Sequence, residues 1–75
     1  MIFPRKGRKG WVIVEWWGDH RAAKGVLVSS YKGIWEVRIK SGSEEFAVVA
    51  DKCDIYTSER RAKREARRRR TAARA

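Results

Sequence analysis

The fold follows most directly from residues 34–40, IWEVRIK. From Trp35 to Lys40 large apolar side chains alternate strictly with charged ones, which is the period of a β-strand with one face in a core and the other in water. Glycine-containing turns flank the segment at residues 32–33 and 41–43, so it is predicted to be a central strand of an antiparallel sheet. The side chains expected inside are Trp35, Val37 and Ile39.

Working outward, short blocks rich in Val, Ile, Trp and Tyr are broken by Gly, Ser and Asp, which is the composition of successive strands. We expect further strands at residues 11–17, 25–31 and 45–50, and a short fifth one at residues 55–56. Residues 18–24 have little apolar content and are predicted to form an exposed loop. Residues 51–54 suit a single tight helical turn before the last strand.

This layout resembles the SH3-like small β-barrel of the KOW, Tudor and archaeal chromatin-protein type, including blocks such as Lys24-Gly25-Val26-Leu27-Val28. The resemblance implies a mainly β, five-stranded barrel over residues 11–56, and several such barrels bind nucleic acid. The archaeal chromatin proteins add a C-terminal helix and bind DNA with a sheet face that carries an exposed aromatic residue. In this chain the basic charge is concentrated beyond the barrel, so no site residue is carried over.

Residues 57–75 are predicted to form a basic C-terminal helix. From Ser58 onward the chain has nine basic and two acidic side chains, a net charge of +7 out of the total of +10. The segment consists mainly of Ala, Arg, Lys and Glu, which are good helix formers, and contains no Gly or Pro. Thr57 or Ser58 can cap its N-terminus, and two acid–base pairs four residues apart support the helix. These pairs are Glu59 with Lys63 and Glu65 with Arg69.

At about 100° per residue, the basic side chains of this helix gather on one arc of about half its circumference. The arc contains Arg60, Arg61, Lys63, Arg64, Arg67, Arg68, Arg70 and Arg74. The opposite side carries Ala62, Ala66 and Ala73. Because three alanines bury little surface, we expect the helix to dock loosely and to become ordered when the basic arc meets phosphates.

Residues 1–10 form a basic N-terminal arm that is expected to be mobile, with Lys6, Arg8 and Lys9 as further phosphate contacts. The chain has four tryptophans, and alternation along the strand predicts that Trp16 and Trp17 point to opposite faces. At least one indole, from Trp11, Trp16 or Trp17, is therefore expected to be exposed. An exposed indole can stack on a base, anchor a protein interface, or pack under the arm or the helix.

The sequence indicates neither catalysis nor a cofactor or metal site. His20 is expected to be a solvent-exposed loop residue and Cys53 a small buried hydrophobic one, and no Cys/His cluster has zinc-ligand spacing. A single cysteine forms no intramolecular disulfide, and the first residues do not have the apolar run of a signal peptide. We therefore expect a cytoplasmic protein with no membrane association.

The charge pattern favours a non-enzymatic nucleic-acid-binding protein that contacts the phosphates of DNA or RNA with low sequence specificity. Three alternatives remain open at this point. The barrel with its exposed tryptophans could be a protein-interaction module, binding a protein partner or a second copy, or the chain could be a component of a ribonucleoprotein or virion. The tail could also be a solvated segment that serves solubility.

Overall fold

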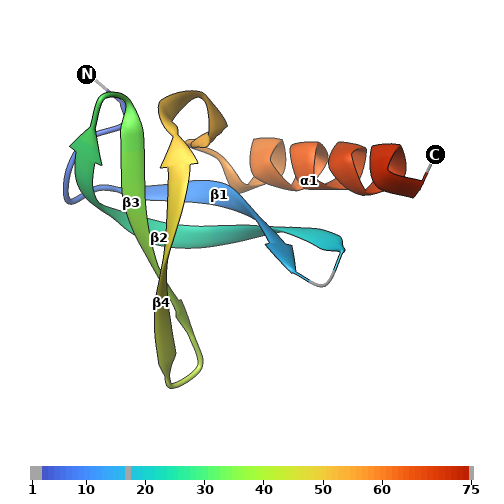
Figure 1. Ribbon diagram of the computed structural model, residues 1–75, viewed down its shortest axis with the longest axis horizontal. Coiled ribbons are helices and arrows are strands. Elements are labelled where there is room, and N and C mark those ends of the chain that lie inside the picture. The colour runs from blue at the N-terminus through green and yellow to red at the C-terminus, as the bar shows by residue number, and fades with distance from the viewer. Residues whose placement is uncertain (1–2, 17, 75) are drawn as a thin grey trace.

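The computed structural model describes residues 3–16 and 18–74, which form an open antiparallel sheet of four strands followed by a C-terminal helix (Figure 1). The strands lie side by side in chain order, each paired with the next. Their bounds are β1 (Lys9–Trp16), β2 (Asp19–Tyr31), β3 (Ile34–Ser41) and β4 (Glu44–Asp51). A single 3-10 turn, η1 (Lys52–Asp54), precedes the helix α1 (Glu59–Arg74).

The long strand β2 is shared by two hairpins that point in different directions (Figure 1). Residues 19–26 of β2 pair with β1, whereas residues 26–31 pair with β3, with a bulge between Leu27 and Ser29. At the change of partner, a Cβ atom on Gly25 would lie 2.6 Å from Val37 Cγ1 and 2.7 Å from the carbonyl oxygen of Arg38. Only glycine therefore permits this close approach of β2 to β3.

The hydrophobic core lies on the face of the sheet enclosed by the two hairpins and η1. Its buried members are Val12, Leu27, Trp35, Val37, Ile39 and Ile55. The alternating burial predicted for residues 34–40 is confirmed, because Trp35, Val37 and Ile39 all belong to this cluster.

Two expectations about the strands are wrong. Residues 18–24 are not an exposed loop, because β2 begins at Asp19 and pairs with β1 up to the hairpin tip. The apolar content of this segment is low because α1 packs on it through alanines, which need only small partners.

A fifth strand is also not formed: Tyr56 makes a single bridge, with two 2.8 Å hydrogen bonds between its backbone and that of Trp11. The helix cap begins two residues later, which leaves no length for a ladder, and no closed barrel is observed over the described residues.

The N-terminal arm, from Phe3 on, is tied to the sheet rather than mobile. The Gly7 N–H donates to the carbonyl oxygen of Leu27 at 2.7 Å, and the Leu27 N–H donates to that of Arg8 at 2.8 Å. Phe3 is half-buried against the core, and Lys9 is already the first residue of β1. The arm therefore continues the edge of β1 along β2.

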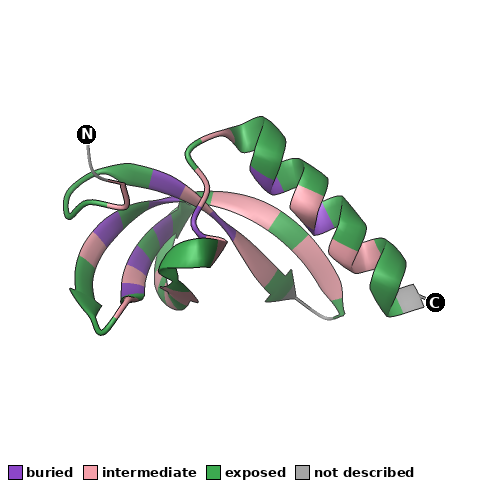
Figure 2. Cartoon of the chain, turned by 90° about the horizontal axis from the view of Figure 1, so that it is seen from above, coloured by how far each residue is buried: buried purple, intermediate pink, exposed green. Residues whose placement is uncertain are grey.

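Helix α1 lies along the β1–β2 hairpin, with its buried positions turned toward the sheet (Figure 2). Ala62 is 0% and Ala66 2% exposed, whereas Ala73 is exposed. The cap is formed by Ser58, whose Oγ accepts a hydrogen bond from the Arg61 N–H at 3.1 Å. The helix is thus docked more closely than its sequence suggested, because two methyl-sized side chains let its backbone come near β2.

Replacing Ala62 by Leu should lower the free energy of unfolding by about 1–3 kcal/mol, because the larger side chain does not fit between α1 and the hairpin. The matched control is Ala72→Leu, which makes the same change at an exposed position of the same helix. Since Leu and Ala have similar helix propensities, the control should stay within about 0.5 kcal/mol of the parent. Urea denaturation followed by tryptophan fluorescence measures both, and equal effects would contradict the docking.

Candidate nucleic-acid interface

The basic arc predicted on α1 is present and faces away from the sheet for most of its members. Its exposed members are Arg60, Arg61, Lys63, Arg64, Arg67 and Arg68. Arg70 is half-buried because it lies against the start of β2, and the side chain of Arg74 lies outside the described residues. The arc is therefore an outward surface that begins beside the hairpin and runs over the exposed side of the helix.

Carboxylates form ion pairs with the cations at the two flanks of this arc. On one flank, Glu65 accepts from Arg68 Nε at 2.6 Å. On the other flank, Lys63 pairs with Glu59, and Arg70 Nη1 lies 3.8 Å from Asp19 Oδ1. The predicted pairs Glu59 with Lys63 and Glu65 with Arg69 are both confirmed.

The middle of the arc is left unpaired. Within residues 3–16 and 18–74, no ion pair involves Arg60, Arg61, Arg64 or Arg67. All four side chains are exposed, and Arg64 lies four residues after Arg60, three after Arg61 and three before Arg67, spacings that make helix residues neighbours on the surface. We call these four residues the free arginine face.

A groove of about 650 Å³ separates α1 from the beginning of β2. Arg60, Lys63, Arg64, Arg67 and Arg70 line it from the helix. The strand supplies Asp19, His20, Arg21 and Ala22. Since six cations and one carboxylate line this groove, its electrostatic potential favours an anion.

The position of His20 differs from the expected solvent-exposed loop. It lies in β2 with its side chain only 16% exposed, and its Nε2 lies 4.0 Å from Oε2 of Glu15, the residue opposite it on β1. The buried Nδ1 has no hydrogen-bond partner within the described part of the chain. The cause of the difference is the cover that α1 provides.

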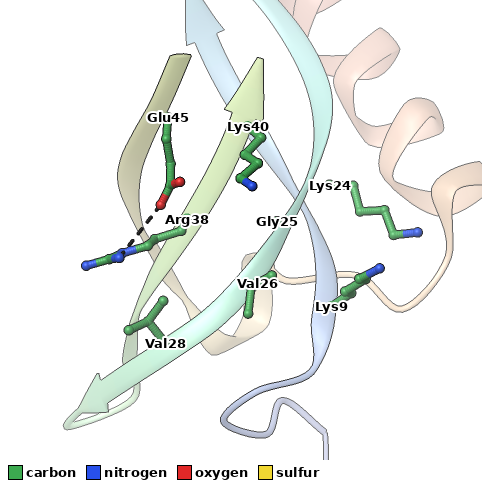
Figure 3. A pocket seen from close by; sticks show the side chains of 8 residues that line it. All are labelled: Lys9, Lys24, Gly25, Val26, Val28, Arg38, Lys40 and Glu45. Carbon is green, nitrogen blue, oxygen red and sulfur yellow. Dashed lines mark ion pairs between the residues drawn. The ribbon is translucent and has the colours of Figure 1, made fainter. Parts of the chain in front are cut away.

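The arm cations do not join the helix groove. Lys6 and Arg8 are exposed and do not line it. Lys9 instead lies on the sheet, in a hollow of about 480 Å³ that it shares with Lys24, Arg38 and Lys40 (Figure 3). Sequence reasoning missed this second group of cations. Its signal was the outward alternation of Arg38 and Lys40 together with the lysines of β1 and β2.

The expected aromatic contacts are only partly described. Trp35 is in the core and Trp11 is half-buried, while the side chain of Trp16 and the whole of Trp17 lie outside the described residues. Tyr31 is 73% exposed, with the Lys32 amine 5.4 Å from the centre of its ring. Cys53, expected to be buried, is exposed in η1, because Ile55 rather than Cys53 turns into the core.

Ionisation near the groove follows from these contacts. The hydrogen bond from Arg68 holds the pKa of Glu65 below its usual range, and Arg21 does the same for the pKa of Asp19. Burial raises the pKa of Tyr56. Glu65 and Asp19 are thus held in their charged forms, paired with the flanking cations.

Replacing Arg68 by Gln should raise the pKa of Glu65 toward that of a free glutamate, and Arg67→Gln, which removes an unpaired cation, should change it much less. Because the folded-state pKa is depressed, the stability from this pair is present above the unfolded pKa and is lost as pH falls through the folded one. An NMR titration of the Glu65 carboxyl carbon measures the shift. Equal pKa values in the parent and in R68Q would contradict the pair.

None of the helices in the described part of the chain combines the length and the apolar character needed to cross a membrane. Residues 3–16 and 18–74 likewise contain no group of three or more His, Cys, Asp or Glu side chains placed to hold a metal ion. No protein-family model, curated protein or solved structure matches this chain. Its function is therefore inferred from the geometry and charge of the site itself.

Proposed function

We propose that this protein is a non-enzymatic nucleic-acid-binding protein that holds phosphates with the free arginine face of α1. The observation that carries the proposal is the combination of a buried Ala62/Ala66 side and an unpaired outward face on the same helix. A helix anchored on one side by packing has its opposite side available for a partner. A partner that matches four adjacent guanidinium groups is a phosphate backbone.

Docking of α1 on the sheet should also raise the affinity for nucleic acid. An isolated arginine-rich helix has to order when it binds, and that ordering opposes association. Here the Ser58 cap and the packing of Ala62 and Ala66 hold the helix before any ligand arrives. The phosphate contacts then add to binding without a large cost of folding.

The proposed contacts between arginine and phosphate imply low sequence specificity. Guanidinium contacts to phosphate set position on a nucleic acid but do not read its bases. The proposal covers DNA and RNA. It also includes an intracellular location, where nucleic acid is the abundant polyanion.

The resemblance to an SH3-like barrel enters the proposal only at the level of layout. The bridge between Trp11 and Tyr56 returns the segment before α1 to the edge of β1. A short last strand would occupy the same place in such a barrel. We propose that the sheet is an open relative of that architecture, with α1 added as the binding element.

The double substitution Arg64→Gln/Arg67→Gln should weaken binding to a short duplex and make it less dependent on salt. Each phosphate contact contributes about 0.9 to the slope of log K against log salt, so removing two of these arginines should reduce the slope by about 1.8. Fluorescence anisotropy over a salt series measures it. The charge-matched control is Lys32→Gln/Lys52→Gln, at exposed positions that line neither the helix groove nor the sheet hollow.

A parent protein that binds duplex DNA, single-stranded DNA and structured RNA weakly, with slopes near zero, would overturn the proposal. Equal decreases in the helix variant and in the control would show that net charge alone acts, without a phosphate site on α1. Binding of a protein partner that persists in the helix variant would instead favour an interaction module.

A further inference from the structure

A second group of cations lies on the sheet, away from the helix groove. Lys9 of β1, Lys24 of β2, and Arg38 and Lys40 of β3 line a hollow together with Val26 and Val28, and Figure 3 shows their places on the three strands. The residues come from three strands that are brought together only by the sheet. We call the four cations the sheet cation cluster.

Most of the positive charge in the cluster is unpaired. Arg38 lies 3.7 Å from Glu36 and 3.7 Å from Glu45, so two carboxylates offset it in part. No ion pair in the described residues involves Lys9, Lys24 or Lys40. Lys9 and Lys24 are diagonal neighbours on paired strands, since Lys9 is opposite Val26, and like charges so placed repel each other. An anion on this surface would relieve that repulsion.

The cluster and the helix groove lie on the same face of β2. Side chains two residues apart on a strand share a face, and the alternate residues His20 and Ala22 line the groove, while Lys24, Val26 and Val28 line the hollow in the cluster. At about 3.3 Å per residue, Ala22 and Val26 are roughly 13 Å apart along the strand. The two cationic surfaces are therefore consecutive, and one extended polyanion can lie across both.

The lining of the two surfaces indicates which polyanion fits. Neither the groove nor the hollow is lined by a Trp, Tyr or Phe within the described residues. Trp11, which is opposite Lys24, lines a separate hollow and is half-buried, so it exposes only part of the ring on which an unpaired base would stack. Lysine amines, arginines and small aliphatic side chains suit a backbone whose bases are turned inward. This is the surface that a duplex presents.

We propose that the sheet cation cluster is a second phosphate-binding surface, and that a nucleic-acid duplex lies across both the cluster and the free arginine face of α1. This inference rests on the proposed function and adds a site to it. The sheet contributes to affinity and fixes the direction in which the duplex crosses the protein. The helix supplies the larger share of the contacts, because more of its cations are unpaired.

The double substitution Lys24→Gln/Lys40→Gln in the full-length chain tests this site. With a short random-sequence duplex, the salt slope should fall by about 1.8, because two lysines no longer contact phosphates. The control Lys32→Gln/Lys52→Gln removes the same charge from exposed positions near the β2–β3 turn and should change the slope much less. Far-ultraviolet circular dichroism verifies that each variant remains folded, and single replacements by Gln at Lys24 or Lys40 substitute for a double variant that does not.

The outcomes separate this inference from the proposed function. If the sheet variant matches the control while Arg64→Gln/Arg67→Gln weakens binding, the sheet site is overturned and the helix site stands. If the parent protein shows no salt-dependent binding, both are overturned. Tighter binding of a single strand than of the duplex would overturn the choice of duplex. A slope reduced in both the sheet and helix variants, and in their combination by about the sum, supports the two-surface contact.

Discussion

The close approach of β2 and β3 at Gly25 is the constraint on which the rest of the structure depends. A side chain at this position would meet both Val37 and the backbone of Arg38, so the two strands come this near only because glycine has none. The approach lets one strand of thirteen residues serve two hairpins. Its second half closes the core with Leu27, and its first half extends beyond β3 as a support for the helix. That extension is the strand with which α1 makes most of its contacts.

The size of the side chains between α1 and β2 determines what the helix presents to its surroundings. Ala62 and Ala66 bring the helix backbone near Ala22, and this turns the free arginine face outward. The few carboxylates in the region, such as Asp19, form ion pairs with cations at the flanks of the helix. Packing and ion pairing therefore act in the same direction, since both leave the unpaired arginines of α1 on the side away from Ala62 and Ala66.

The same strand face connects the two cationic surfaces, which gives the molecule a directional character that a flexible basic tail would not have. A tail binds polyanions in any orientation, whereas a docked helix and a rigid sheet present their cations at set positions. Because the helix is ordered before binding, association would not incur the conformational-entropy cost of ordering a flexible arginine-rich segment. In the proposed mode of binding, discrimination between bases is not expected, because the contacts would be made to the backbone.

By itself, the sequence determined the local features of this protein: the alternation that buries Trp35, Val37 and Ile39, the turns on either side, the Ser58 cap, and the helical arc of arginines. Each depends on residues close in the chain. Tertiary structure decided the rest. The segment 18–24 has the composition of a loop, yet it enters β2 at Asp19 because α1 packs against it. The predicted fifth strand is reduced to one bridge because the helix begins so soon after it. The cations Lys9, Lys24, Arg38 and Lys40 come together only because three strands pair. The physical reason is that side-chain periodicity reports burial within one element, whereas the partner that covers a face, and the charges that gather on it, depend on how separate elements pack.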